Sequence, residues 1–271
     1  MLDHVRALLI DLDGVLYVED EPIAGAAEAV GRLRAGLALR FVTNTTSRSR
    51  SHTLDKLARL GFDIAEDELV TPAALAVAQC ARQGYRRVAM VMNDEVKREF
   101  AALEESDDAQ AVIVGDLGDG FDYDVLNRAF RQVMAGAELI ALQKNRYWLR
   151  ADGLSLDVGP FVAALEYATG REAYVVGKPS RGFFDEILRG LRVEAGAAAM
   201  VGDDVESDVG GAMRAGLAGM LVRTGKYRAD AVRDSGVEPT VTVDSIADVP
   251  SLLALDAGAR SARRDRGIDP P

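Results

Sequence analysis

Two aspartates close to the start of the sequence are the first residues whose type and spacing suggest chemistry. The apolar run at residues 7–10 predicts a strand buried on both faces, and Asp11 and Asp13 stand at its end. Residues two apart in an extended chain project to the same side, and Gly14 lets the backbone turn away. Like charges held this close repel one another unless a cation joins them. The pair therefore indicates a cation site, with an ordinary surface turn as the alternative.

Polar residues also follow three other predicted strands. These are Thr43 and Asn44 after residues 37–42, Lys178 after residues 174–176, and Asp203, Asp204 and Asp208 after residues 197–201. In open parallel sheets, ligands bind outside the carboxyl ends of the strands, at the point where the strand order reverses. We therefore expect the four clusters to converge.

Each cluster has a purely structural alternative. The acids at 203–208 could cap a helix N-terminus, and Thr43 could cap the following helix, although Thr46 or Ser47 is better placed for that role. Lys178 could be a solvated lysine in a turn. The segment around Lys178 is also similar to the end of a phosphate-binding P-loop, but that motif requires glycine at position 172, which is Glu, and Pro179 removes the amide that it needs.

The elements that would position these residues alternate between strand and helix. Helical apolar spacing at residues 23–33 and 47–60 separates the first strands, and Gly61 suits the second helix as its C-cap. Such alternation is typical of βαβ units around a parallel sheet. A second α/β pattern without polar strand ends, with strands at 88–92, 111–115 and 139–142 and a helix at 126–134, has the size of an inserted domain. We expect a core of residues 1–74 and 173–257, an inserted α/β domain at 75–172, and a disordered tail at 258–271.

Composition narrows the chemistry. The chain has 271 residues, a formal net charge of −11 and two histidines, His4 and His52. The acidic balance argues against nucleic-acid binding, which needs a basic face. No apolar run is long enough to span a membrane and no signal peptide is evident, so we expect a cytoplasmic protein. With one cysteine, Cys80, a thiolate or imidazole zinc site is nearly excluded, and any metal should be a hard cation held by oxygen.

Several other residues have simple structural interpretations. Cys80 is expected to be a small buried apolar residue, and the acidic run at residues 104–108 a solvated loop. Four aromatic residues are expected in the core: Tyr123, Phe130, Phe161 and Tyr167.

The clusters, taken in order, closely resemble the motifs of the haloacid dehalogenase superfamily of phosphotransferases. Asp11-Leu12-Asp13-Gly14-Val15 is similar to the first motif, Thr43-Asn44 to the second, Lys178 to the third, and Gly202-Asp203-Asp204 with Asp208 to the fourth. The insertion between the second and third motifs resembles the type IIA arrangement, in which a large α/β cap covers a Rossmann-like core. Segments 158–168, 176–179 and 223–226 are similar to a branch that contains phospholysine, phosphohistidine and pyrophosphate phosphatases. The resemblance extends to about residue 255.

This resemblance implies roles for individual residues. Asp11 would be the nucleophile that forms an aspartyl-phosphate, and Asp13 would protonate the leaving group and then take a proton from water. Mg²⁺ would be bound directly by Asp11, Asp203 and the backbone carbonyl of Asp13. Asp208 and Asp204 would lie in the next layer of residues around the ion, where Asp208 would orient metal-bound water. The charge of the transferring group would be held by Thr43, amides near Asn44, and Lys178. Within 144–159 the resemblance places the substrate-specificity candidates Lys144, Arg146, Tyr147 and Trp148, although Trp148 could equally pack inside the cap.

The expected function is an Mg²⁺-dependent phosphatase acting on a small phosphorylated metabolite, a phosphoramidate or pyrophosphate. A metal-independent dehalogenase and a non-catalytic interaction protein on the same scaffold are the alternatives. Neither nucleic acid nor membrane is an expected partner, and a homodimer through the cap is a further expectation.

Overall fold

A computed structural model describes residues 2, 4–150 and 153–253 of the chain. The tail expected at residues 258–271 lies outside these described residues. The chain divides into two compact units: Met1–Val42, Leu57–Leu69 and Phe184–Pro271 form the first, and Thr43–Lys56 and Val70–Phe183 the second. The second unit contains residues 75–172, and the assignment of that segment as a cap stays a prediction.

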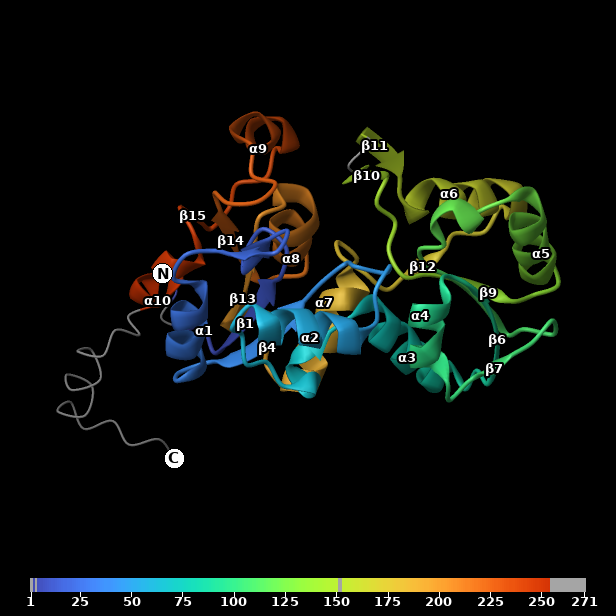
Figure 1. The fold of residues 1–271 in the computed structure, drawn as a ribbon, viewed down its shortest axis with the longest axis horizontal. Coiled ribbons are helices and arrows are strands. Elements are labelled where there is room, and N and C mark those ends of the chain that lie inside the picture. The colour runs from blue at the N-terminus through green and yellow to red at the C-terminus, as the bar shows by residue number, and fades with distance from the viewer. Residues whose placement is uncertain (1, 3, 151–152, 254–271) are drawn as a thin grey trace. The chain divides into compact units, whose positions relative to one another are not determined.

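A six-stranded sheet in the order β15-β14-β13-β1-β4-β5 organises the first unit (Figure 1). Its strands are β1 (Ala7–Asp11), β4 (Ala38–Val42), β5 (Leu69–Val70), β13 (Ala198–Gly202), β14 (Ala218–Val222) and β15 (Val241–Val243). The pairs that β1 forms with β13 and β4, and that β14 forms with β13 and β15, are parallel. All five residues of β1 and of β13 are buried, which confirms the expectation of strands covered on both faces.

The position of β1 within this sheet matters for function. It lies between β13 and β4, two strands far apart in the sequence, so the strand order reverses beside it. Asp11 is the last residue of β1 and pairs with Val42, the residue before Thr43. The carboxyl end of β1 is therefore the topological switch point of the sheet, where ligands bind in open α/β folds.

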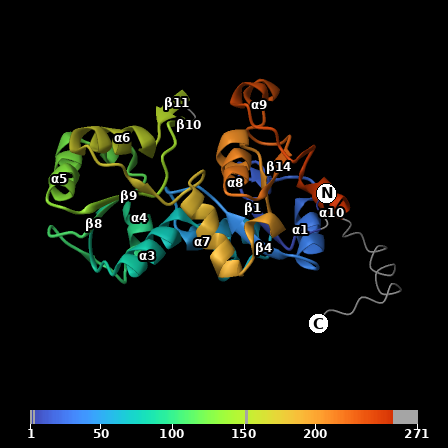
Figure 2. The ribbon, with the colours of Figure 1, turned by 180° about the vertical axis from the view of Figure 1, so that it is seen from behind.

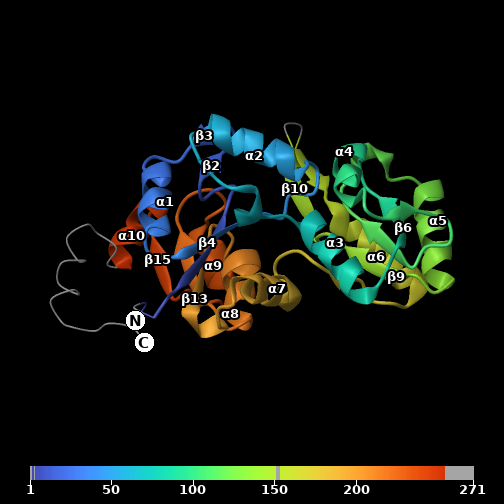
Figure 3. The same cartoon turned by 90° about the horizontal axis from the view of Figure 1, so that it is seen from below.

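Helices cover both faces of this sheet. In two opposite views α1 (Ala26–Arg34) lies on one side of the strands and α8 (Gly211–Arg214) on the other (Figures 1 and 2). Buried residues of α1 recur with helical spacing at Ala26, Ala29, Val30 and Leu33, and α10 (Val249–Leu252) lies beside this helix (Figure 3). A short antiparallel pair, β2 (Tyr17–Val18) and β3 (Glu21–Pro22), follows β1, and α9 (Ala229–Ser235) follows β14.

The helix that follows β13 is short and is preceded by a wider helical turn. A π-helix covers Val205–Gly210, and α8 follows it directly. The backbone oxygen of Asp204 accepts hydrogen bonds from the N–H groups of both Asp208 and Val209, at 3.1 and 3.2 Å. A carbonyl shared between the fourth and the fifth residue after it widens the turn, and π-turns of this kind are frequent at functional sites.

The second unit is built on a five-stranded parallel sheet in the order β12-β9-β8-β6-β7. The strands are β6 (Arg87–Val91), β7 (Glu104–Glu105), β8 (Ala111–Val114), β9 (Glu138–Ala141) and β12 (Tyr174–Val175). Helices α5 (Tyr123–Met134) and α6 (Val158–Thr169) lie on one face, and α3 (Pro72–Gln83) and α4 (Asp94–Lys97) on the other (Figures 1 and 2). The predicted α/β class is thus confirmed in both units. Among the described residues, every helix is too short or too polar to cross a bilayer.

Local sequence patterns did not predict two features of this division: two helices belong partly to each unit, and the second unit contains an additional hairpin. Helices α2 (Arg50–Arg59) and α7 (Arg181–Leu191) each begin in the second unit and end in the first. Strands β10 (Tyr147–Arg150) and β11 (Gly153–Leu156) form an antiparallel hairpin in the second unit. Its strands are only four residues long, so their alternation is too short to separate them from loop.

Two of the aromatic expectations are wrong. Tyr123 is 78% exposed because it is the first residue of α5, ahead of that helix's buried face. Tyr167 is 94% exposed because it stands two residues, or about 200°, beyond the buried Leu165 of α6. Phe161 stacks on Phe121 with ring centroids 3.8 Å apart, and Phe130 packs partly buried against the core of this unit.

Two further expectations concern buried and acidic residues. Cys80 is fully buried, as predicted. The acidic run is exposed at Glu104 and Glu105, but these two residues form the edge strand β7 instead of a loop. The backbone of Arg86 accepts a hydrogen bond from the N–H of Glu104, and this pairing overrides the local charge pattern.

Candidate active site

Three buried carboxylates meet in the first unit. Asp11 ends β1, Asp203 follows β13, and Asp208 lies in the π-helix, and one oxygen of each falls within 4.8 Å of the others. Their exposed fractions are 7%, 2% and 1%. Burying three negative charges together is costly unless a cation neutralises them. An all-oxygen donor set of this kind suits a hard cation such as Mg²⁺ and does not suit a thiolate- or imidazole-binding metal.

Glycines make room for these carboxylates. A Cβ atom at Gly14 or at Gly225 would collide with the Oδ2 atom of Asp203, and one at Gly202 would collide with the Asp208 side chain. Gly14 and Gly225 also have positive φ angles, 79° and 59°. Asp203 therefore occupies a cradle that any larger residue at Gly14 or Gly225 would fill, which is a second indication that the carboxylates are held in place.

The loop after β14 completes this cradle. The Lys226 backbone N–H donates a 2.7 Å hydrogen bond to Asp203 Oδ2, and the Thr224 hydroxyl donates to the backbone oxygen of Gly14. Desolvation opposes the charge on Lys226, but attraction to four carboxylates, those of Asp203, Asp11, Asp204 and Asp208, raises its pKa above the usual lysine value. No role for these residues was predicted beyond the family resemblance of 223–226. The available signal was that a fifth strand, β14, is followed by a polar sequence, Arg-Thr-Gly-Lys at residues 223–226.

Asp204 has a local structural role. Its Oδ1 atom accepts hydrogen bonds from the N–H groups of Glu206 and Ser207, at 3.1 and 2.9 Å, and so caps the π-helix. Its own backbone N–H points to Asp208 Oδ2, at 3.3 Å. Asp204 thus holds the turn that carries Asp208, which agrees with the capping alternative for this residue.

Asp13 lies in the turn between β1 and β2. It is exposed, unlike Asp11, and pairs with Tyr17 through an isolated backbone bridge. The N–H of Gly14 donates to the backbone oxygen of Tyr17, at 2.7 Å, and closes the turn. Burial of the Tyr17 phenol, followed by the charges of Asp13, Asp11 and Asp20, raises the pKa of Tyr17 far above its usual range. The buried and exposed positions of Asp11 and Asp13 suit different chemical tasks.

The second unit holds Thr43, Asn44 and Lys178 together. Lys178 is 3% exposed and Thr43 4%, so the solvated-lysine alternative is wrong. The Asn44 side chain bonds to Lys178 twice: Nδ2 donates to the Lys178 backbone oxygen at 2.9 Å, and Oδ1 accepts from the Lys178 N–H at 2.8 Å. The structure therefore joins the second and third sequence clusters through their backbone and side chains.

The helix after Thr43 is capped by a residue that was not predicted. Helix α2 begins at Arg50, and Ser49 Oγ accepts from the His52 N–H at 3.2 Å, so Ser49 is its N-cap in place of Thr46 or Ser47. Thr43 Oγ1 accepts a 3.0 Å bond from the Thr45 N–H. Thr43 is thus outside the cap, as the ligand interpretation requires.

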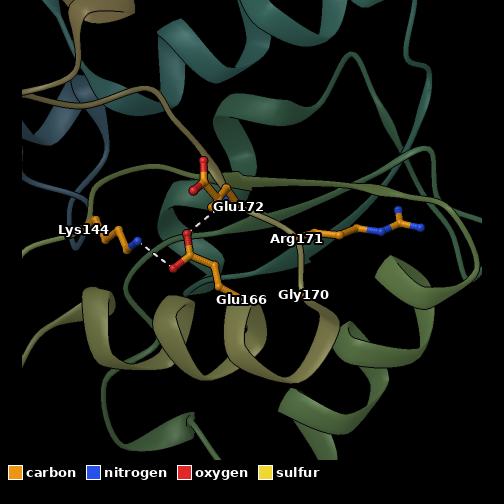
Figure 4. Close-up of a pocket in the computed structure, with 6 residues that line it drawn as sticks. Lys144, Glu166, Gly170, Arg171 and Glu172 are labelled. Carbon is orange, nitrogen blue, oxygen red and sulfur yellow. Dashed lines mark hydrogen bonds and ion pairs between the residues drawn. The ribbon is translucent and has the colours of Figure 1, made fainter.

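The specificity candidates lie in the second unit, around β10. Lys144 lines a surface pocket of about 400 Å³ with Glu166, Gly170, Arg171, Glu172 and Ala173, and forms a 2.6 Å ion pair with Glu166 (Figure 4). The Arg146 guanidinium lies 6.0 Å from the Tyr147 ring centroid. Tyr147 is 57% exposed and Trp148 46%, so Trp148 does not pack as a core residue. These four residues are accessible to a ligand.

The fold and the carboxylate site first define a class: an α/β enzyme with an acidic centre at the switch point of a parallel sheet. Residues 8–104 match the family model of haloacid dehalogenase-like hydrolases, and residues 175–249 match a second, HAD-hydrolase-like model. The human haloacid dehalogenase-like hydrolase domain-containing protein 2 is 46% identical over 242 residues, which cover 89% of this chain and 93% of that protein. The chain belongs to the haloacid dehalogenase-like hydrolase family, which confirms the predicted resemblance.

Two phosphatases are among the similar proteins. Human phospholysine phosphohistidine inorganic pyrophosphate phosphatase is 43% identical over 263 residues, covering 94% of this chain and 97% of that protein. The crystal structure of a glycerol phosphate phosphatase from Mycobacterium tuberculosis in complex with magnesium has a TM-score of 0.77 and 30% identity, covering 90% of this chain and 77% of that chain. Within the family, this chain is a hydrolase of the phosphatase class.

Proposed function

We propose that this enzyme is an Mg²⁺-dependent phosphatase that hydrolyses a small phosphorylated molecule through an aspartyl-phosphate. The observation that carries the proposal is the group of three buried carboxylates, Asp11, Asp203 and Asp208, at the switch point of the sheet. A carboxylate nucleophile next to a hard cation is the combination that phosphoryl transfer by an aspartate requires.

The metal ligands would be side chains and one backbone group of the first unit. Asp11 and Asp203 would bind Mg²⁺ through their carboxylates, and Asp13 through its backbone carbonyl. Asp208, held by the Asp204 turn, would orient the water around the ion. When bound, Mg²⁺ would neutralise charge on the phosphoryl oxygens. The magnesium in the similar glycerol phosphate phosphatase supports this choice of metal.

The covalent steps would be divided between Asp11 and Asp13. A carboxylate oxygen of Asp11 would attack phosphorus, and the bond from phosphorus to the leaving group would break as Asp13 donates a proton to that group. Water would then attack the phosphorus of the aspartyl-phosphate, Asp13 would take its proton, and the bond to Asp11 would break with release of phosphate. The exposed position of Asp13 suits this task, because a proton shuttle exchanges with substrate and water.

Thr43, the backbone amide near Asn44, and Lys178 would hold the negative charge of the transferring group. Thr43 directly follows Val42, the sheet partner of Asp11, which supports its assignment. Lys178 would supply the cation that receives an anionic substrate on a protein with a net charge of −11.

The substrate would be a phosphoramidate such as phosphohistidine or phospholysine, pyrophosphate, or a small phosphate monoester. The names of the two similar phosphatases support these classes. Residues 75–172 would act as the specificity cap, with Lys144, Arg146, Tyr147 and Trp148 contacting the leaving group. A homodimer through this segment and a cytoplasmic location belong to the same proposal, and a monomeric mass by light scattering would reject the dimer.

A metal-independent dehalogenase is the less favoured function. Displacement of halide from carbon uses a carboxylate nucleophile but has no need for Asp203 and Asp208 beside it. Activity that survives complete removal of metal by EDTA, with release of halide from a haloacid, would favour this alternative.

Phosphate release provides the test. Purified protein should release phosphate from p-nitrophenyl phosphate with Mg²⁺ and lose this activity in EDTA, and Asp11→Asn should lower turnover on the order of 10³-fold or more. Asp67→Asn, an exposed acid in the same unit, is the matched control and should keep wild-type turnover. A panel of phosphohistidine, phospholysine, pyrophosphate, glycerol phosphate, phosphoglycolate and pyridoxal phosphate then ranks substrates by kcat/KM. Wild-type turnover in Asp11→Asn would overturn the mechanism.

A further inference from the structure

The side chain of Asn44 forms two hydrogen bonds with the backbone of Lys178, a residue far away in the sequence. Its Nδ2 donates to the Lys178 carbonyl oxygen at 2.9 Å and its Oδ1 accepts from the Lys178 N–H at 2.8 Å, across 134 positions of sequence. Two antiparallel hydrogen bonds to the N–H and C=O of the same residue fix both the position and the rotation of that residue's backbone. The segment after β4 is thereby joined to the segment after β12.

The surroundings of this pair leave it little freedom. Lys178 is 3% exposed, so its backbone groups have little access to water. Gly177 precedes it in a tight space: a Cβ atom there would lie 2.6 Å from the Leu142 backbone oxygen and 2.9 Å from Asn44 Oδ1. The Asn44 amide therefore lies directly against Gly177. Only glycine fits at position 177, between the Leu142 backbone oxygen and the Asn44 amide.

No other small residue can make both bonds. An aspartate carboxylate could accept from the Lys178 N–H, but it would have no proton to donate to the Lys178 carbonyl oxygen. Serine and threonine have a single hydroxyl group on a shorter side chain, which cannot reach both backbone groups. An alanine would leave a buried N–H and C=O without their partners. The requirement is for one donor and one acceptor at this distance, which the asparagine amide supplies.

We propose that Asn44 is a positioning residue for Lys178: its side-chain amide fixes the Lys178 backbone, and through it the ammonium group that holds the transferring phosphate. The inference rests on the phosphate-binding role proposed for Lys178. It gives Asn44 a task that requires no contact between its side chain and substrate. Because Asn44 Oδ1 accepts a hydrogen bond from the Lys178 N–H and Nδ2 donates one to the Lys178 oxygen, the orientation of the Asn44 side-chain amide is fixed by Lys178.

A double-mutant cycle measures whether Asn44 acts through Lys178. With p-nitrophenyl phosphate and Mg²⁺, Asn44→Ala in the wild-type background should lower kcat/KM by about 10- to 100-fold, mainly by raising KM. In the Lys178→Met background the same change should cost less than about threefold, because the ammonium that it positions is gone. Equal losses in both backgrounds would overturn the proposal. Asn127→Ala, an amide removed from α5 of the same unit, is the control for loss of an asparagine.

The pH profile of Asn44→Asp gives a readout that a general loss of stability would not produce. The carboxylate lacks the donor to the Lys178 carbonyl, whereas the protonated acid has both a donor and an acceptor, like the amide. The kcat/KM of Asn44→Asp relative to wild type should therefore rise severalfold as the pH falls from about 7.5 to about 5. The rise should disappear in the Asn44→Asp, Lys178→Met double variant. A rise that persists there would mean that the carboxylate repels substrate directly, and would reject the positioning role.

The two levels of inference fail separately. If Lys178→Met alone keeps the wild-type KM, the proposed role of Lys178 is wrong, whatever Asn44 does. If Lys178→Met raises KM strongly while the Asn44→Ala losses add to it, Lys178 binds phosphate but Asn44 does not act through it. Thermal unfolding of every variant, followed by circular dichroism, separates these outcomes from loss of the fold.

Discussion

Gly14 faces Asp203 so closely that a Cβ atom at Gly14 would collide with the Asp203 carboxylate, and Gly225 faces the same oxygen. Gly14 directly follows Asp13 in the turn after β1, and Gly225 lies in the loop after β14, 211 positions later in the sequence. Both have positive φ. The place of one carboxylate is thus defined by two residues that have no side chain.

Gly14→Ala should impair metal binding more than it impairs folding. The new methyl group would displace the Asp203 carboxylate, and the positive φ would add about 1–2 kcal/mol of backbone strain. We expect kcat/KM to fall on the order of 10²-fold or more, with weaker Mg²⁺ binding by isothermal titration calorimetry. Unchanged Mg²⁺ affinity would show that the position of Asp203 is not set by this glycine.

Gly31→Ala is the matched control for that substitution. Gly31 lies inside α1, a Cβ atom there would meet no neighbouring atom within 4 Å, and its φ is not positive. Replacing it should raise the free energy of unfolding by about 0.5–1 kcal/mol through helix propensity, with unchanged activity.

Asp204 offers a comparison between capping and charge. Asparagine at this position keeps an acceptor for the N–H groups of Glu206 and Ser207, whereas alanine removes it. Asp204→Ala should therefore lower the free energy of unfolding by about 1 kcal/mol and disturb Asp208, while Asp204→Asn should stay close to wild type in both thermal stability and Mg²⁺ affinity. If both variants lose Mg²⁺ affinity equally, the negative charge of Asp204 matters more than its cap.

The parts of the fold that were predictable are those with strong local patterns. Apolar runs predicted the strands β1, β4 and β13, and the polar residues after them marked the switch-point edge. Asp203 and Asp208 could be proposed from the same signal, because a carboxylate after a fully buried strand needs a partner. The amphipathic pattern of α5 also predicted its core face but not that its first residue, Tyr123, stands outside it.

The interactions that could not be predicted are those between distant residues. Nothing near Asn44 indicates that its amide pairs with Lys178, and nothing near Gly14 indicates Gly225 on the other side of Asp203. The N-cap of α2 was misplaced because two successive hydroxyl-bearing residues, Thr46 and Ser47, offered local alternatives. Ser49 takes that role because a partner from α4 holds it, and local propensity does not contain such a contact.

The Cys80 thiol should be unreactive in the folded enzyme. The thiol is fully buried in α3, and burial, with a smaller contribution from the charge of Glu138, raises its pKa to about 11. Because the thiolate is the reactive form, native protein should not react with an aromatic disulfide reagent at pH 8 over minutes. One equivalent should react in guanidinium chloride. Rapid labelling of the native protein would show that α3 opens readily.

Glu95 should make the enzyme less stable as the pH falls. Its Oε1 accepts hydrogen bonds from the backbone N–H and the hydroxyl of Ser49, at 2.9 and 3.0 Å, and Arg48 lies 3.3 Å from Oε2. The hydrogen bond from the Ser49 N–H lowers the pKa of Glu95, although burial acts in the opposite direction. The Ser49 hydroxyl, Arg48 and His52 lower this pKa further. A lowered pKa in the folded state means that this stabilisation is present above the ordinary glutamate value of about 4.3 and is lost as the pH falls through the folded pKa.

Thermal unfolding between pH 7 and pH 3 should show this dependence directly. Glu95→Gln should have a lower Tm than wild type at pH 7, and the difference should shrink as the pH falls below about 4, because wild-type Glu95 is then protonated too. Ser49→Ala, which also removes the N-cap of α2, should cost about 1 kcal/mol or more at pH 7. Glu104→Gln, at the exposed edge strand β7, controls for the general effect of removing one negative charge. A Tm difference for Glu95→Gln that is constant across this range would show that the carboxylate charge does not hold Ser49.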